Sequence, residues 1–355
     1  MSSASSSAAK ETSSPFYYAC RNGDTDKVRE LIEQMTLKEI DRIEPNGSTA
    51  LHAASFYGHA EIVKILLKRG ASRSLHNKYN AIPYEEASDE IKKLFLRPKL
   101  DRFFQDTEGN IDWMKCDAEA EKIAENFRFR HSGFGWSAKN TAHRLKHIKE
   151  EMSSTEQEQV HNFLDQAEKN PMSLLRAYTV ESDFYRNLNK DLAKRHFEQG
   201  TNFGLTYFVD FFYNHPAFKE LSFIGTCYRG MSISKDDLQQ YRLGTKIMNK
   251  AFLSTSIEQQ VAEHFGTKVD SVRKTLDGTI LKISAVCKFT LVNPRSGLLI
   301  ENISEFRHEK EVLVGPYTAF LITAVRRVTP TYVEIDLQEC KTLEQAEENS
   351  DDEDE

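Results

Sequence analysis

The sequence predicts a multidomain protein in which an all-α stack of repeats precedes an α+β domain. Residues 15–97 carry a helical pattern that recurs at intervals of 33 to 35 positions, which is typical of a repeat stack. After Gly225, short runs rich in β-branched and aromatic residues replace the helical pattern. These runs favour an antiparallel two-sheet β core beside a helical subdomain. The 355 residues are enough for two domains or three small ones.

The first residues, 1–14, are rich in Ser and Ala, and we expect them to be disordered. They lack the apolar stretch of about 7–15 residues that a signal peptide needs, and no part of the chain has the ~20 consecutive apolar residues of a transmembrane helix. The five cysteines are scattered, odd in number and without a Cys-x-x-Cys spacing, so we expect free thiols. These features predict a cytoplasmic location without membrane contact, although a protein exported without a cleaved leader would have the same features.

Residues 47–71 contain one complete repeat. It begins Gly-Ser-Thr-Ala-Leu-His-Ala-Ala and ends Leu-Leu-Lys-Arg-Gly-Ala, and it resembles an ankyrin repeat with Ala50 in place of the usual Pro. Residues 82–87 match part of this repeat 33 positions further on. An upstream copy lies 35 positions earlier, where Ala19, Gly23, Val28 and Leu31 correspond to Ala54, Gly58, Val63 and Leu66. Residues 15–97 therefore hold two recognisable repeats and a truncated third.

One helical face of the complete repeat is apolar. Ile62, Val63 and Leu66 recur at helical spacing, and a single helix cannot bury such a face without a stacked neighbour. Three units are close to the minimum for a stable stack. The ankyrin resemblance implies a module that recruits a protein partner or substrate.

Residues 98–154 are harder to assign, and we predict a connector of helices with an exposed turn and no known function. Gly133–Ala138 matches the dinucleotide-binding pattern G-x-G-x-x-[G/A]. That pattern must follow a buried strand, and Phe127–His131 is too basic to form one. A Rossmann-type site is therefore not expected.

Three polar motifs lie in the predicted α+β domain, residues 155–338. Arg229-Gly230 follows a β-rich run, Ser254-Thr255-Ser256 comes 25 positions later, and Glu309-Lys310-Glu311 precedes an apolar run. A planar guanidinium binds phosphate in a bidentate manner that lysine cannot copy. Extended backbone directs alternate side chains to one face, which would bring the two serines together and likewise the two glutamates.

In this order the motifs resemble the Arg, Ser-Thr-Ser, Glu-x-Glu signature of ADP-ribosyltransferases, which cleave NAD and transfer its ADP-ribose to a protein. Ser304–Leu313 also matches the family's Ser-x-Phe-x-x-Glu-x-Glu-Val-Leu. Leu174–Thr179, followed by Leu188 and Asn189, resembles the helical entry of the vertebrate-type arginine-specific enzymes. One departure is Gly315, since the family often has two prolines at this point.

The resemblance implies a role for each site residue. Arg229 would hold the pyrophosphate of NAD, and Ser254 would hold the nicotinamide ribose and orient the catalytic carboxylate. Glu311 would stabilise the charge that develops on the ribose, as carboxylates do in glycoside cleavage. Glu309 would engage the guanidinium of an acceptor arginine. The predicted catalytic residues are Glu311, Glu309 and Ser254, and the predicted NAD-binding residues are Arg229, Gly230, Ser254, Ser256 and Glu311.

Charge and histidine usage predict neither a metal nor a nucleic acid as a ligand. The eleven histidines form no His-Glu-x-x-His motif and no zinc-ligand spacing with Cys. Residues 347–355 hold seven acids, which account for the whole formal charge of −7. The rest of the chain is near neutral and lacks the basic surplus of a nucleic-acid-binding protein. We expect residues 339–355 to form a disordered acidic tail, with an interaction role as the alternative.

The predicted function is NAD-dependent mono-ADP-ribosylation of protein arginines, with release of nicotinamide. Two alternatives stay open. An NAD glycohydrolase would transfer the ribosyl group to water, and a catalytically inert ankyrin scaffold would keep the fold without turnover. The sequence does not name the protein substrate or the ankyrin partner, nor does it decide between NAD and NADP.

Overall fold

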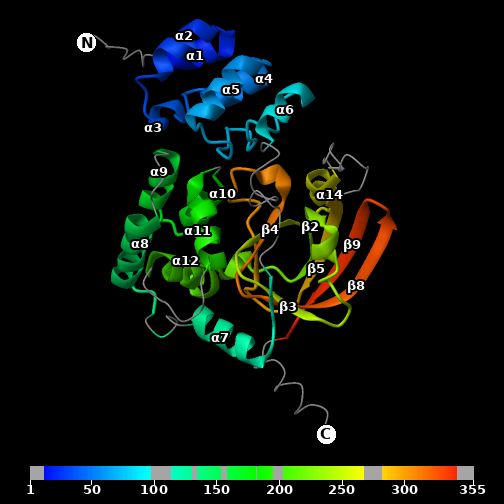
Figure 1. Cartoon of the computed structure of the whole chain (residues 1–355). Coiled ribbons are helices and arrows are strands. Elements are labelled where there is room, and N and C mark those ends of the chain that lie inside the picture. Colours follow the sequence, from blue (N-terminus) through cyan, green and yellow to red (C-terminus); the bar gives the residue numbers. More distant parts are fainter. Residues whose placement is uncertain are drawn as a thin grey trace, which may run out of the picture. The chain divides into compact units, whose positions relative to one another are not determined.

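The computed structural model describes residues 12–96, 113–129, 133, 135–152, 158–180, 182–194, 203–267 and 282–341. The chain forms two compact units, residues 1–96 and 97–355, which we call the N-terminal and the C-terminal unit (Figure 1). The segments expected to be disordered lie mostly outside the described residues. Within the described ranges, no helix is both long and apolar enough to cross a membrane.

The N-terminal unit consists of short helices packed in pairs. Helix α1 contacts its pair mate α2 and also α4 of the next repeat, and α5 packs against α2, α4 and α6. Residues 83–86 form turns, so only one helix follows in the third repeat. The predicted all-α repeat stack is confirmed. Its helices are α1 (Pro15–Asn22), α2 (Thr25–Ile32), α3 (Leu37–Ile40), α4 (Ala50–Phe56), α5 (Ala60–Arg69) and α6 (Asp89–Phe95).

Two histidines link neighbouring repeats. His59 Nε2 lies 2.9 Å from the Arg21 carbonyl in the first repeat, and His52 Nε2 lies 3.0 Å from the Ala81 carbonyl in the third. Burial lowers the pKa of His52, which keeps the ring neutral. A Cβ on Gly23 would lie 2.8 Å from the His59 ring, so this close approach of two repeats requires glycine.

The C-terminal unit combines a helical subdomain with a sheet (Figure 1). Its helices are α7 (Ala118–Phe129), α8 (Ala138–Met152), α9 (Glu158–Gln166), α10 (Met172–Thr179), α11 (Asp183–Lys194), α12 (Phe203–Asn214), α13 (Lys235–Leu238) and α14 (Gln259–Thr267), with 3-10 turns η2 (Pro216–Leu221) and η3 (Arg307–Glu309). Its strands are β1 (Trp113–Lys115), β2 (Gly225–Ser234), β3 (Lys246–Asn249), β4 (Leu253–Ser256), β5 (Lys282–Leu291), β6 (Gly297–Leu299), β7 (Glu311–Val314), β8 (Ala319–Thr329) and β9 (Tyr332–Glu339).

The strands follow the order β1-β3-β8-β9-β5-β2-β4-β7-β6. The predicted α+β class is confirmed, but the two separate antiparallel sheets are not what the structure has. The described strands form one hydrogen-bonded sheet, in which β5 and β9 run parallel. The β2–β4 junction consists of a single pair, Tyr228 with Ser256, so the β4-β7-β6 group attaches to the rest of the sheet at one point.

The segment that we expected to be a connector supplies parts of the C-terminal unit. Strand β1 pairs with β3, where Trp113 faces Asn249, and α8 packs along α12. Arg144 of α8 forms a buried ion pair with Asp210 of α12 at 2.9 Å. Helix α7, rather than a strand, precedes Gly133, so the described residues do not form the strand that a Rossmann site needs.

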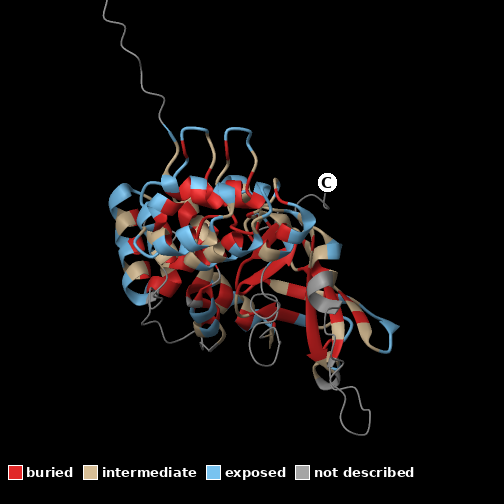
Figure 2. Ribbon diagram, turned by 90° about the horizontal axis from the view of Figure 1, so that it is seen from above, coloured by how far each residue is buried: buried red, intermediate tan, exposed pale blue. Residues whose placement is uncertain are grey.

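Two hydrophobic clusters lie on opposite faces of β4 and β7. Leu253 and Val312 join the cluster of the sheet, whereas Phe252 and Leu313 join the cluster of the helical subdomain. This alternation follows from the two-residue period of a strand. Every residue of β4 and β7 is buried, and Figure 2 shows much of the sheet in red, the colour of buried residues. The strands that carry the Ser-Thr-Ser and Glu-x-Glu motifs are therefore enclosed on both faces, which restricts their movement.

Candidate active site

Arg229 lies in the middle of β2, which pairs with β5 from Gly225 to Ser234. Its side chain is only 5% exposed, and its Nη1 donates to the Ser254 backbone carbonyl at 2.8 Å. This contact joins β2 to β4 beside the single backbone pair between these strands. The first two predicted motifs, 25 residues apart in the chain, are thus in direct contact.

Ser254 connects the second motif to the third. Its Oγ donates to Glu311 Oε1, and the backbones of β4 and β7 are paired so that Ser256 faces Glu311. Thr255 Oγ1 donates to the Val312 carbonyl at 2.7 Å and so holds the same two strands together. The hydroxyl and the carboxylate come from positions 57 residues apart, so the tertiary fold alone creates this pair.

Ser256 has a different local task from Ser254. Its Oγ accepts a hydrogen bond from the Glu258 backbone N–H at 3.0 Å, at the turn that leads into α14. Such a contact satisfies a backbone donor near a helix start. Gly230 follows Arg229 in β2 and is buried. We therefore find Arg229, Ser254 and Glu311 in one chain of contacts, with Ser256 and Gly230 next to them in the same strands.

Glu309 and Glu311 are not on one extended strand, in contrast to our expectation. Glu309 ends η3, Lys310 has a φ of +45°, and Glu311 is the first residue of β7. The left-handed residue between them breaks the two-residue alternation. Both glutamates are buried, at 1% and 0% exposure. Lys310 itself forms an ion pair with Glu258, and this hydrogen bond raises the Lys310 pKa.

Helix α10 holds the loop that leads to Glu309. The Glu305 backbone N–H donates to Thr179 Oγ1 at 3.1 Å, and Arg176 Nη2 donates to Glu305 Oε1 at 3.3 Å. Glu305 is 4% exposed, so the ion pair is largely shielded from water. Our sequence reasoning missed Arg176 and Glu305 as supporting residues. The signal available was a charged side chain inside each of two matched motifs, Leu174–Thr179 and Ser304–Leu313.

The thiol next to Arg229 is not a nucleophile. Cys287 faces Arg229 across the β2–β5 pair, and burial raises its pKa to about 12 even though the guanidinium acts in the opposite direction. Burial likewise raises the pKa of Cys227 to about 12. Both thiols are therefore protonated near neutral pH, because the reactive form of cysteine is the thiolate. Among the predicted site residues, the ionisable groups are Arg229, Glu309 and Glu311.

These residue types match the parts of NAD. A guanidinium suits the pyrophosphate, a serine hydroxyl suits a ribose, and a carboxylate suits the ribose carbon that becomes positively charged as neutral nicotinamide departs. The contacts Arg229–Ser254 and Ser254–Glu311 bring these three chemistries together. In the part of the chain that the structure describes, no group of three or more His, Cys, Asp or Glu side chains is arranged to hold a metal ion.

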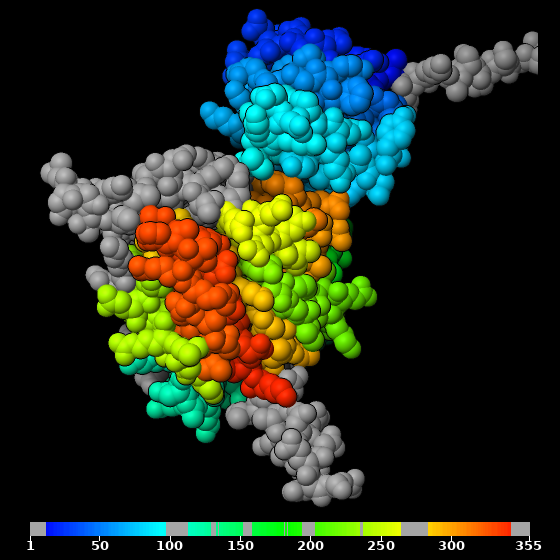
Figure 3. Space-filling model, turned by 90° about the vertical axis from the view of Figure 1, so that its right-hand side faces the viewer, coloured from blue at the N-terminus to red at the C-terminus, as the bar shows by residue number. Residues whose placement is uncertain are grey.

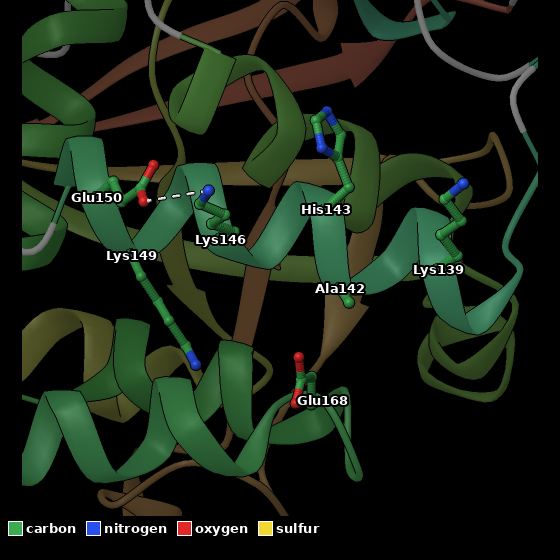
Figure 4. Close-up of a pocket in the computed structure, with 7 residues that line it drawn as sticks. All are labelled: Lys139, Ala142, His143, Lys146, Lys149, Glu150 and Glu168. Carbon is green, nitrogen blue, oxygen red and sulfur yellow. Dashed lines mark ion pairs between the residues drawn. The ribbon is translucent and has the colours of Figure 1, made fainter.

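A separate surface hollow of about 530 Å³ lies along α8 (Figure 4). Its lining includes Lys139, His143 and Lys146 but none of the predicted site residues. Lys146 pairs with Glu150 at 3.7 Å, as the dashed line in Figure 4 marks. Basic and acidic side chains thus line the hollow together, and none of the three motifs contributes to it.

Comparison with known proteins finds relatives for both units. A family model for ankyrin repeats, in three copies, matches residues 3–77. The human Notch-regulated ankyrin repeat-containing protein is 37% identical over 76 residues, which are 21% of this chain and 67% of that protein. Its Xenopus laevis counterpart is 40% identical over 65 residues, 18% of this chain. The matched part spans 57% of the length of the Xenopus protein.

Two solved structures similar to the chain are bacterial proteins. HopU1, an ADP-ribosyltransferase of Pseudomonas syringae pv. Tomato DC3000, is 17% identical with a TM-score of 0.38, covering 64% of this chain and 99% of that one. The type III effector XopAI of Xanthomonas axonopodis pv. citri is 15% identical with a TM-score of 0.40, covering 63% and 97%. These similarities are weak, and the assignment rests on a family model.

The model for NAD:arginine ADP-ribosyltransferases matches residues 100–345, which is more than half of the chain. The match includes β1, α7 and α8 as well as the three motifs. The chain therefore belongs to the NAD:arginine ADP-ribosyltransferase family, and ankyrin repeats precede its transferase domain.

Proposed function

We propose that this ADP-ribosyltransferase modifies arginine side chains of proteins and that Arg229, Ser254 and Glu311 form its NAD site. Family membership supports NAD-dependent transfer of ADP-ribose. The observation that carries the assignment of residues is the contact chain from the Arg229 guanidinium through Ser254 to the Glu311 carboxylate. In each turnover, NAD supplies the ADP-ribosyl group and nicotinamide is the leaving group.

Arg229 would bind the pyrophosphate of NAD, and Ser254 would orient the Glu311 carboxylate. The Arg229 guanidinium is anchored through Nη1 to the Ser254 carbonyl, so its planar fork is held in a fixed direction for phosphate oxygens. The Ser254 hydroxyl donates to Glu311, which fixes the direction of that carboxylate before substrate arrives. Preorganised groups cost no rearrangement at the moment of reaction, which is the main source of electrostatic catalysis.

Glu311 would stabilise the positive charge that develops on the ribose carbon as the bond to nicotinamide breaks. A carboxylate that is fully buried acts in a low-dielectric setting, where its interaction with a cation is stronger than in water. The same logic applies to the carboxylates of glycosidases. Gly230 and Ser256 would contribute to the walls of the NAD site from the same two strands, β2 and β4.

Glu309 would select arginine as the acceptor. It lies two residues before Glu311 at the end of η3, and a carboxylate forms charge-assisted, often bidentate, hydrogen bonds with a guanidinium. Arg176 and Thr179 hold the preceding loop through Glu305, which would keep Glu309 in place. The N-terminal unit would recruit the protein substrate. The five free cysteines agree with action in a reducing, cytoplasmic compartment.

The full chain incubated with NAD and a small guanidino compound such as agmatine tests this proposal. We expect release of nicotinamide together with an ADP-ribosylated guanidine detectable by mass spectrometry, and no product with a lysine analogue. Nicotinamide release with free ADP-ribose as the only product would instead identify an NAD glycohydrolase. Absence of nicotinamide release from the folded chain would leave the ankyrin scaffold as the function.

A further inference from the structure

The peptide bond between Ala251 and Phe252 is held on both sides by buried asparagine side chains. The Phe252 N–H donates to Asn189 Oδ1 at 3.0 Å, and the Ala251 carbonyl accepts from Asn249 Nδ2 at 2.7 Å. Both asparagines are buried, at 2% and 0% exposure. Strand β4 begins one residue later, at Leu253, so the clamped peptide fixes the point where the strand that carries Ser254 begins.

Asn189 connects this peptide to the helical subdomain. It lies on α11, and its Nδ2 donates to the Tyr178 hydroxyl of α10 at 2.9 Å. The Phe252 ring packs against Tyr178 at a centroid distance of 5.5 Å and against Phe212 of α12 at 5.0 Å. The apolar contacts place the ring but cannot fix the backbone direction, whereas a hydrogen bond to the N–H does.

Asn249 connects the same peptide to the segment after β7. Its Nδ2 also donates to the Gly315 carbonyl at 2.8 Å, and its Oδ1 accepts from the Thr318 N–H at 2.9 Å. Gly315 follows the last residue of β7, where Val314 pairs with Leu253 of β4. One side chain thus ties together the adjoining ends of the two strands that carry Ser254 and Glu311.

Gly315 allows this arrangement. A Cβ at this position would lie 2.2 Å from the Tyr213 hydroxyl, which itself donates to the Pro316 carbonyl at 2.7 Å. The glycine at this position is therefore matched to the close approach of Tyr213. The segment after β7 packs closely enough against α12 for Asn249 to reach it.

We propose that Asn189 and Asn249 are positioning residues, which hold β4 so that Ser254 meets both Arg229 and Glu311. The inference rests on the proposed function, because it assigns these asparagines to the same NAD site. Ser254 lies two residues beyond the clamped peptide, so a shift of that peptide moves its hydroxyl and its carbonyl together. A misplacement of about 1 Å can lower a rate by about 10²-fold.

Substitutions at Asn189 test the inference in the full chain. Asn189→Leu removes the acceptor for the Phe252 N–H, whereas Asn189→Asp keeps an acceptor of the same shape. We expect kcat for nicotinamide release to fall by roughly 10- to 100-fold in the Leu variant. The Asp variant should retain at least fivefold more activity than the Leu variant, and it also serves if the Leu variant does not fold. Equal activity of the folded Asp variant and a folded Leu variant, or wild-type kcat in the Leu variant, would overturn the inference.

Asn293→Leu is the matched control. Asn293 is also a buried asparagine, but its Nδ2 donates to the Cys340 carbonyl beyond β9. We expect this variant to lose thermal stability and to keep its kcat. Amide hydrogen exchange of residues 251–256 should accelerate in Asn189→Leu and stay unchanged in Asn293→Leu. Unchanged exchange in Asn189→Leu would contradict the clamp independently of any activity.

The Ser254→Ala background distinguishes positioning from general structural damage. If Asn189 acts through Ser254, adding Asn189→Leu to Ser254→Ala should lower kcat by a smaller factor than in the wild type, because the hydroxyl is already absent and only the carbonyl that holds Arg229 is left to be displaced. A full additional loss would refute the route through Ser254. A wild-type chain that releases no nicotinamide would contradict the proposed function. An active wild type with an unaffected Asn189→Leu variant would contradict this inference alone.

Discussion

Arg229 contributes to the fold, and in the proposed site it would also bind the substrate. Its Nη1 is used inside the protein, on the Ser254 carbonyl, and the guanidinium is almost completely buried in β2. The sequence predicted that Arg229, Ser254 and Glu311 form one site, and their contacts agree with that prediction. The arrangement of Glu309 was not predictable, because the left-handed Lys310 depends on η3, which the local sequence pattern does not reveal.

Arg229→Lys should weaken the hold on NAD. Lysine keeps the charge but lacks the planar fork, and each charge-assisted hydrogen bond lost is worth about 1.5–3 kcal/mol. We expect the KM for NAD to rise by roughly 10- to 100-fold. Arg326→Lys is a suitable control, because Arg326 pairs with Glu334 and Asp336 on β9, away from the motifs. Identical NAD saturation curves for Arg229→Lys and the wild type would remove Arg229 from the pyrophosphate site.

At the scale of elements, α8 and α12 are joined by the buried Arg144–Asp210 ion pair. Arg144 also donates to the Gly135 carbonyl and lies 4.3 Å from the centre of the Trp136 ring. This network explains why residues expected to connect two domains pack within one of them. The pair was not predictable from the sequence, since its members are 66 residues apart and neither lies in a recognised motif.

Arg144→Met should lower the free energy of unfolding of the C-terminal unit by about 3–5 kcal/mol, because it leaves the Asp210 charge buried without its partner. Urea denaturation followed by circular dichroism measures this loss. The double variant with Asp210→Leu should recover part of it, since apolar replacements can substitute for a buried pair. Arg326→Met is the control, because Arg326 of β8 forms an exposed ion pair with Asp336 of β9. These two strands form part of the surface in Figure 3. The control variant should lose about 1 kcal/mol or less of unfolding free energy. An equal loss in both single variants would contradict the role of burial.

His215, which follows α12, should make stability depend on pH. Burial, assisted by the charges of Arg295 and Arg144, lowers its pKa to about 4. The unfolded chain binds a proton at this residue below about pH 6.5, whereas the folded chain does not until about pH 4. The free energy of unfolding should therefore fall as the pH falls from 6.5 towards 4. In His215→Gln this part of the pH dependence should disappear, and an unchanged pH profile would show that His215 does not titrate as described.

At the scale of the whole molecule, the chain divides into two units with separate hydrophobic cores. The repeat period and the β-rich runs after Gly225 were enough to predict both fold classes, because each is a local pattern in the sequence. The order of the strands and the parallel pairing of β5 with β9 were not predictable, since pairing partners depend on contacts between distant segments. The contacts of Asn189 and Asn249 with the peptide between Ala251 and Phe252 were not predictable for the same reason.

Deletion of residues 1–97 should separate the catalytic activity from the recruitment of protein substrates. An ankyrin stack has its own core, and none of the transferase motifs lies in it. The truncated chain should therefore keep its kcat on a small guanidino acceptor within about threefold while labelling of native protein targets in a lysate falls. A truncated chain that is folded yet inert on the small acceptor would mean that the repeats contribute to the active site.

The contrast between Glu311→Gln and Glu309→Gln tests the proposed chemistry most directly. Nicotinamide release and transfer to agmatine are measured side by side for each folded variant. In the proposed mechanism Glu311 stabilises the charge formed in every turnover, so its amide variant should lose both activities by roughly 10²–10³-fold. The role proposed for Glu309 concerns the acceptor and not the cleavage of NAD, so its amide variant should still hydrolyse NAD while transfer falls sharply. Loss of both activities in Glu309→Gln, or retention of both in Glu311→Gln, would contradict the assignment of the two carboxylates and the arginine specificity inferred from it.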